Sequence, residues 1–459
     1  MMRQPLTAIL VGALLLGGCN LAPAYQRPAE IVPPQWPQGP AYPAAADVAA
    51  GLTWRTLVAD ERLRTIVSRA LTDNRDLRAT VANVEAARAQ YRIQRSTLLP
   101  TVTGQSGAQL NGGRPGDFNS YSANVGFSAF EIDLFGRQRN LRREAFERYL
   151  ATAEGARSTR ITLVAETANA WVTYAADNDL LAVARDTVAS ASRALQITNE
   201  LDSAGLISKL DVREAETVLA QAQSDVESSI TRLAQDKNAL ELLAGGSIDV
   251  ALLPRSLVEI DPTLAVPPAG LASAVLLARP DVVSAEHQLK AANADIGAAR
   301  AAFFPTISLT AALGLASTAL SNLFTGGALG WTVQPGASIP IFGGPVRGNL
   351  AYSRAQREVY LNDYERAVQQ AFRDVADALA RRGTIGAQRA AQRRLVVANQ
   401  QTLLLASAQY RAGIASFLNT LTAQRSLYVA RQNEIITIQA DLSNRLTLYS
   451  AIGADDPVP

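Results

Sequence analysis

The sequence predicts an α+β membrane protein in which long helices, arranged as two copies of one unit, are interrupted by four strands able to cross a bilayer. Three observations predict it. Segments recur at a nearly constant offset, two long spans lack proline, and segments of about ten residues alternate apolar with small polar side chains. The composition agrees, because 48% hydrophobic but only 6% aromatic residues suit closely packed helices better than one thick core.

Residues 1–18 have the pattern of a signal peptide. Arg3 precedes an apolar run from Leu6 to Leu16, which is too short to cross a bilayer as a helix. The chain's one cysteine, Cys19, follows directly on Leu-Gly-Gly, which resembles a bacterial lipobox. We therefore expect cleavage before Cys19, a lipid on Cys19, and a lipidated N-terminal segment over 19–56. The alternative is an ordinary signal peptide beside an incidental cysteine. Asn20 rather than Asp follows, which fits export to the outer membrane.

An internal duplication organises the rest of the chain. The matching pairs of segments are 74–102 with 279–307, 134–136 with 341–343, and 204–210 with 412–418, at offsets of 205 to 208. Three matches at so constant an offset indicate two copies of one unit. We assign the first repeat to 57–245, a linker to 246–270, the second repeat to 271–452 and a tail to 453–459.

Each repeat contains one span that lacks proline and has little glycine. These spans predict long helices at about 137–202, 208–244, 346–410 and 417–451, with shorter helical stretches near 57–98 and 271–303. The long helices pair into two antiparallel hairpins. Their tips, at about 203–210 and 411–418, turn on Gly205 and Gly413, since glycine accepts left-handed dihedral angles without penalty.

Four strands are expected at about 100–111, 118–134, 305–317 and 329–342. Ser120–Ala129 and Trp331–Ile341 show the alternation that gives one apolar face and one small, polar face. Strands of this length can cross a bilayer when tilted, whereas a soluble sheet with one wet face would give the same pattern. Four strands cannot close a barrel, so a water-filled channel needs at least a trimer with twelve strands.

Other function classes find little support. The chain has 43 Lys and Arg residues against 41 Asp and Glu residues, with the two signs mixed along the sequence. It therefore lacks the basic stripe that is typical of nucleic-acid binding proteins. One cysteine and one histidine, His287, argue against metal centres and nucleophilic catalysis, so we expect no enzyme, no cofactor and no catalytic or metal site. Met1 and Met2 are the only methionines, and both lie in the signal peptide, so no thioether stripe for copper or silver exists.

Four segments resemble TolC-like outer-membrane efflux channels of the OprM/NodT lipoprotein branch. They are Cys19–Pro28, Glu131–Arg137, Arg279–Leu309 and Tyr410–Leu427, and the resemblance covers essentially the whole mature chain. It implies a homotrimer in contact with outer-membrane lipid, with a 12-stranded β-barrel in the outer membrane and a helical barrel in the periplasm. It also implies that the hairpin tips meet a periplasmic adaptor (membrane fusion) protein, which joins the channel to an inner-membrane transporter.

The resemblance also places the residues of a periplasmic aperture. It assigns the apolar constriction to Leu418 and a basic residue to Arg425, with Tyr410 and Asp211 beside them. Thr422 stands where the family commonly has Asp, so cation selectivity stays open. We hypothesise that Arg425 pairs with Asp211. The expected adaptor contacts lie on the tips: Gly205, Leu206, Ser208, Leu210, Gly413, Ile414, Ser416 and Phe417.

The leading hypothesis is an outer-membrane exit duct of a tripartite efflux pump. It would conduct drugs or other small molecules passively from periplasm to exterior and open when an adaptor binds. The alternatives are a protein-secretion or metal-efflux outer-membrane channel and, from a different class, a lipid-anchored periplasmic coiled-coil scaffold.

Overall fold

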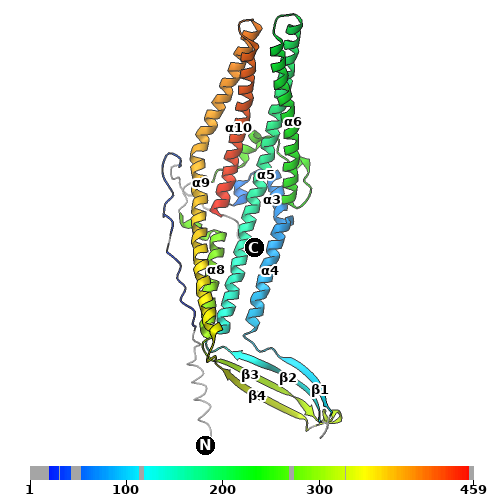
Figure 1. Ribbon diagram of the computed structural model, residues 1–459, viewed down its shortest axis with the longest axis vertical. Coiled ribbons are helices and arrows are strands. Elements are labelled where there is room, and N and C mark those ends of the chain that lie inside the picture. Colours follow the sequence, from blue (N-terminus) through cyan, green and yellow to red (C-terminus); the bar gives the residue numbers. More distant parts are fainter. Residues whose placement is uncertain are drawn as a thin grey trace. The chain divides into compact units, whose positions relative to one another are not determined.

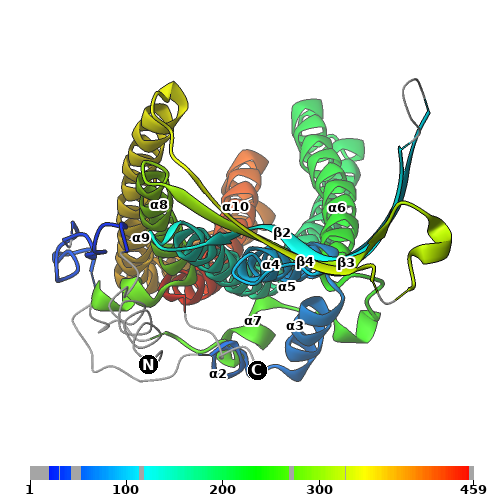
Figure 2. The ribbon, with the colours of Figure 1, turned by 90° about the horizontal axis from the view of Figure 1, so that it is seen from below.

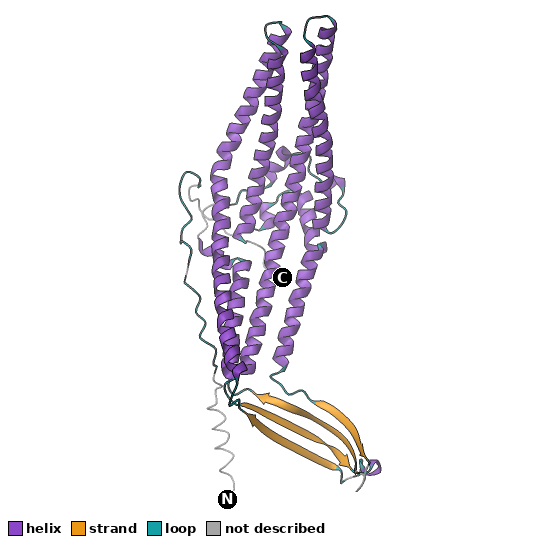
Figure 3. Cartoon of the chain, in the orientation of Figure 1, coloured by secondary structure: helices purple, strands orange, loops and turns teal. Residues whose placement is uncertain are grey.

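A computed structural model describes residues 20–29, 31–42, 53–112, 118–267, 273–325 and 327–453 (Figures 1 and 3). The expected signal peptide, Cys19 and most of the expected tail lie outside the described residues. The chain divides into two compact units. One, here the sheet unit, comprises 1–29, 82–154 and 283–367; the other, here the hairpin unit, comprises 30–81, 155–282 and 368–459.

The sheet unit contains one four-stranded antiparallel sheet in the order β1-β2-β3-β4, whose strands lie side by side in Figure 1 and are seen from below in Figure 2. The strands are β1 Thr103–Asn111, β2 Phe118–Ile132, β3 Thr306–Ser317 and β4 Leu329–Ser338. The central pairing, β2 with β3, joins the two repeats and sets Val125 opposite Leu313. All four expected strands are present. β4 ends earlier than expected, at Ser338, because Pro340 lacks the N–H that would continue the ladder.

A bulge interrupts β2 where the sequence suggests regular alternation. The register shifts between Phe127 and Phe130, and Ala129 takes a left-handed φ of 52°. The Ala129 N–H donates to the hydroxyl of Thr310 (3.0 Å) instead of to a ladder carbonyl. The expected alternation through Ala129 is therefore wrong at this residue, because an extra residue in one strand breaks the two-residue period.

Four helices belong partly or wholly to the sheet unit. They are α4 Arg75–Ser96, α5 Arg137–Ser203, α8 Pro280–Ala301 and α9 Gly344–Arg411. Residues 20–29, here the N-terminal strap, lie along α8. Arg300 donates to the carbonyl of Leu21 (3.1 Å), and Asn293 donates to that of Pro23 (2.7 Å). Further along, Tyr25 and Arg27 both reach the buried carboxylate of Glu286 (3.0 and 2.7 Å).

The hairpin unit has the larger apolar core. Its other elements are α2 Trp54–Leu57, α3 Glu61–Asp73, α6 Lys209–Ala244, α7 Leu257–Ile260 and α10 Phe417–Ile452, with 3₁₀ turns at Val250–Leu252, Asp261–Thr263 and Ser273–Ala278. Trp54, Trp171 and Tyr449 are among its largest fully buried side chains. The long helices α5, α6, α9 and α10 start and end within a few residues of their expected bounds.

The two shorter helical stretches are more broken than expected. The stretch near 57–98 divides into α2, α3 and α4, because Asn74 ends α3 and its side chain then accepts from the N–H of Leu77 (2.9 Å) to start α4. The stretch near 271–303 starts as a 3₁₀ turn, and α8 begins at Pro280, whose fixed φ suits a first helical position. Among the described residues, no helix is long and apolar enough to cross a membrane.

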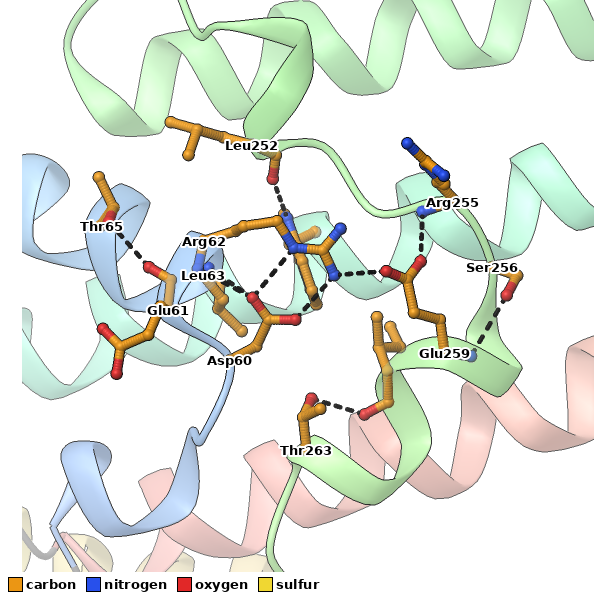
Figure 4. Close-up of polar contacts among 12 residues, drawn as sticks. Asp60, Glu61, Arg62, Leu63, Thr65, Leu252, Arg255, Ser256, Glu259 and Thr263 are labelled. Carbon is orange, nitrogen blue, oxygen red and sulfur yellow. Dashed lines mark hydrogen bonds and ion pairs between the residues drawn. The ribbon is translucent and has the colours of Figure 1, made fainter.

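Ion pairs fix the short segments that interrupt the long helices (Figure 4). Arg62 on α3 donates to Asp60 (2.8 Å) and also contacts Glu259 on α7 (2.9 Å). Burial disfavours the Asp60 carboxylate, but the hydrogen bonds from Arg62 outweigh it and hold the pKa of Asp60 below its usual value. These contacts tie α7 to the start of α3.

Candidate channel aperture at the hairpin tips

The two hairpin tips turn through the same backbone geometry. Gly205 between α5 and α6 has φ 74°, and Gly413 between α9 and α10 has φ 68°. After the first glycine, the N–H of Leu206 donates to the carbonyl of Leu201 (2.9 Å). After the second, Ile414 donates to Gln409 over the same distance. Both tips are thus Schellman turns that need a left-handed residue, as the sequence predicts from the two glycines.

The tips differ in how the next helix starts. Ser208 forms a capping box with Asp211, whose carboxylate accepts from the Ser208 N–H (3.2 Å) and hydroxyl (3.0 Å). At the second tip, Ser416 makes no side-chain cap bond. The N–H of Asp211 also donates to the Ser208 hydroxyl (3.4 Å), so three side-chain hydrogen bonds fix the helix start at the first tip and no side-chain cap bond does so at the second.

An apolar cluster packs the two hairpins together beneath the tips. Phe417 is 3% exposed and lies against Tyr410, with ring centroids 5.0 Å apart, and against residues of the first hairpin such as Val218. Phe417 was expected to contact an adaptor. That expectation is wrong, because its ring is inside this cluster.

Tyr410 is largely enclosed by the same cluster. Burial raises the pKa of its phenol and the charge of Asp211 adds to the rise. Its hydroxyl is buried without a hydrogen-bond partner among the described residues. Tyr410 thus packs between the hairpins rather than forming part of an open lining.

Other tip residues are well exposed. Leu206, Leu210 and Ile414 are 70%, 65% and 78% exposed, so the tips present apolar side chains to their surroundings. The remaining expected contacts, Gly205, Ser208, Gly413 and Ser416, are also exposed. Contact of these residues with an adaptor stays a prediction.

The expected aperture residues of α10 share one exposed face. Leu418 is 50% exposed, and Thr422 and Arg425 follow it at helical spacing and are also exposed. The hypothesised pair of Arg425 with Asp211 is wrong within the described chain. No ion pair joins the two side chains, and the Asp211 carboxylate instead accepts hydrogen bonds from the N–H and the hydroxyl of Ser208.

Polar links between the hairpins lie further from the tips, and sequence reasoning missed them. The hydroxyl of Tyr428 on α10 donates to Asp225 on α6 (2.8 Å), and Gln424 donates to Ser190 on α5 (3.3 Å). Burial, followed by the bond to Asp225, raises the pKa of Tyr428. No local pattern marks these residues, because the partners are more than 200 positions apart.

Two carboxyl groups meet between α5 and α6. Asp236 lies within hydrogen-bonding reach of Asp177, and Arg232 donates to Asp177 (3.2 Å). Burial, the bond with Asp177 and the charge of Asp177 together raise the pKa of Asp236 to about 7. One oxygen of Asp236 is buried without a hydrogen-bond partner among the described residues, and the raised pKa favours a proton on Asp236 that it can donate to Asp177.

Nothing in the described part of the chain forms a group of three or more His, Cys, Asp or Glu that would hold a metal ion. The one histidine, His287, instead contacts Glu147 (2.7 Å) in the sheet unit.

The model of the family described as outer membrane efflux protein matches residues 66–246 and 271–454. The toluene efflux pump outer membrane protein TtgC of Pseudomonas putida is 43% identical over 464 residues, which cover 98% of this chain and 96% of that protein. The outer membrane protein OprJ of Pseudomonas aeruginosa is 39% identical over 465 residues, covering 99% and 96%.

Solved structures give the same result. A membrane protein from Pseudomonas aeruginosa superposes with a TM-score of 0.88 at 36% identity, covering 95% of this chain and 100% of that one. The open state of the MtrE outer membrane channel of Neisseria gonorrhoeae gives a TM-score of 0.83 at 33% identity, covering 95% and 98%. The scaffold alternative is therefore wrong, and the expected fold of four barrel strands per protomer with a helical barrel of two repeats is confirmed. The chain belongs to the outer membrane efflux protein family and is the outer-membrane exit duct of an efflux pump.

Proposed function

We propose that three copies of the chain form the duct, with β1 of one copy pairing with β4 of the next. The order β1-β2-β3-β4 leaves β1 and β4 at the edges of the sheet. Lipid offers no partner to an open strand edge, so the edges must pair with another copy. Three copies give twelve strands, a number that encloses a water-filled pore. A lipid on Cys19 would hold each copy to the membrane.

The aperture is the exposed face of α10 that follows the second tip. Leu418, Thr422 and Arg425 share this face, and this is the observation that carries the proposal. A ring of three Leu418 side chains would form an apolar constriction that resists wetting and so limits leakage. The neutral Thr422 leaves Arg425 as the charged residue of the face, which disfavours the passage of cations.

Opening follows from contact with a periplasmic adaptor at the tips. Leu206, Leu210 and Ile414 offer exposed apolar surface to such a partner. An adaptor that binds the open arrangement more tightly than the closed one shifts the population towards open. An inner-membrane transporter supplies the energy for transport.

The cargo is a set of small apolar or amphiphilic molecules. Relatives at 43% identity are named as toluene and antibiotic efflux proteins. A deletion strain profiled against solvents, antibiotics and metal salts tests this. Hypersensitivity to solvents and antibiotics supports it, whereas hypersensitivity to metal salts alone would favour the metal-efflux alternative.

Conductance of the purified full-length protein in planar bilayers tests the duct and its aperture. Leu418→Ala should raise the resting conductance several-fold, because it removes the constriction. Leu404→Ala is the matched control, since Leu404 is a similarly exposed leucine on α9 (64%). Equal conductance of the two variants would refute the role of Leu418, and a wild type that forms no pores would refute the trimeric duct. Thr422→Asp should increase the preference for cations.

A further inference from the structure

A cavity of about 540 Å³ in the sheet unit is not explained by conduction. Its walls come from the N-terminal strap at Asn20, from Tyr91 on α4, and from the first residues of α5. α5 begins at Arg137, shortly after β2 ends at Ile132. The cavity is therefore near the chain's crossing from the sheet into the helices, and its wall includes Asn20, which follows Cys19 in the sequence.

The cavity has an excess of positive charge. Arg139 is neutralised by Asp133 (3.1 Å), and the carboxylate of Glu147 is in contact with His287 (2.7 Å). Arg142 and Arg143 also line the cavity. Within the described residues, neither of these two has an ion pair or a hydrogen bond from its side chain. The cavity wall thus carries two positive charges that no carboxylate of the described residues pairs.

A buried donor in the cavity wall also lacks an acceptor. Asn140 is 3% exposed, and its Nδ2 is buried with no hydrogen-bond partner among the described residues. A buried amide N–H₂ without an acceptor costs on the order of 1–3 kcal/mol, so such groups are nearly always satisfied. Asn140 and the two arginines together lack an acceptor that carries negative charge.

We propose that this cavity binds the phosphate of an anionic phospholipid headgroup from the periplasmic leaflet of the outer membrane. Guanidinium groups bind phosphate oxygens in paired, charge-assisted bonds, and the Asn140 amide can donate to a further oxygen. The rings of Tyr91 and Phe146, tilted by 53° with centroids 5.2 Å apart, offer apolar surface to the glycerol and the first methylenes. Asn20 directly follows Cys19, so the lipidated end of the strap brings this cavity to the membrane surface.

Native mass spectrometry of the full-length channel tests the proposal. The protein is reconstituted in phosphatidylcholine nanodiscs with a minor share of phosphatidylglycerol, and retained phosphatidylglycerol is counted. Arg142→Gln with Arg143→Gln should reduce its retention roughly tenfold, because charge-assisted bonds are lost. Arg393→Gln with Arg394→Gln is the control, because these adjacent, exposed arginines lie on α9 away from the cavity wall. The control should retain the lipid as the wild type does.

Equal retention by both double variants would overturn the proposal. Displacement of the lipid by millimolar inorganic phosphate, with phosphate remaining bound to the wild type, would identify a free-anion site and also overturn it. If the first double variant fails to assemble, photoactivatable phosphatidylglycerol is crosslinked to the wild type. Crosslinks within 136–147 support the site, and crosslinks confined to the strands refute it. Pore conductance is measured in parallel, so loss of lipid binding is distinguished from loss of the channel.

Discussion

Asp236→Asn should remove a pH dependence of stability from the hairpin unit. The free Asp side chain has a pKa of 3.8, and in the folded chain the pKa of Asp236 is about 7. For a fully enclosed group, a pKa raised by about three would correspond to about 4 kcal/mol in the free energy of unfolding. Asp236 is only half-buried, and solvent screening reduces the effect to about 1–2 kcal/mol.

The sign follows from proton linkage. The folded state holds the proton more tightly than the unfolded state, so the stabilisation is complete below pH 3.8 and is lost as the pH rises to about 7. The wild type should therefore unfold more easily at pH 8 than at pH 5. Asparagine keeps a donor for Asp177 but cannot ionise, so the variant should lose most of this slope.

The assay is thermal unfolding followed by circular dichroism at pH 5, 6, 7 and 8. Glu227→Gln is the control, because Glu227 is an exposed carboxylate on the same helix. It should leave the slope unchanged. A slope in Asp236→Asn as steep as in the wild type would refute the proton-sharing pair.

Three further changes test other contacts. Gly126→Ala should destabilise the sheet by about 1–3 kcal/mol, since its Cβ would collide with the carbonyl of Ala311, and heat-modifiable migration on gels should then occur at lower temperature. Tyr428→Phe should weaken the link to Asp225 by about 1 kcal/mol and raise resting conductance; an unchanged conductance would mean that this bond does not hold the hairpins closed. Leu442→Ala should cost about 2–5 kcal/mol, because Leu442 is fully buried in the hairpin core, and a melting temperature equal to wild type would contradict that packing.

Much of the fold follows from local signals in the sequence. The long helices were predictable because they contain no proline beyond their first turn and little glycine, and the tips because left-handed turns favour glycine. The helix break at Asn74 was not predictable, since Asn can sit inside a helix or cap one, and only the surroundings decide. The bulge at Ala129 likewise depends on how β2 pairs with β3, and the alternation of apolar and polar residues in the sequence does not predict it.

The candidate aperture was predictable only in part. Phe417 and Leu418 are adjacent and both apolar, yet one is buried between the hairpins and the other is exposed. Helical periodicity identifies the two faces but does not say which meets a partner helix. Two further contacts join residues of separate helices and therefore could not be predicted from a local sequence motif. They are the bond of Tyr428 to Asp225 and the Asp177–Asp236 pair.

The central pairing of β2 with β3 has a consequence for how the chain matures. β1 and β2 emerge from the secretion machinery well before β3 and β4, which lie about 180 residues later. A two-stranded ribbon alone is only marginally stable. The β1–β2 pair therefore keeps an apolar face and an unpaired edge exposed until β3 has been exported and pairs with β2. Such non-local closure is slow and exposed to aggregation. Periplasmic chaperones that shield residues 103–132 should therefore limit the yield of assembled channel more than those that shield 306–338.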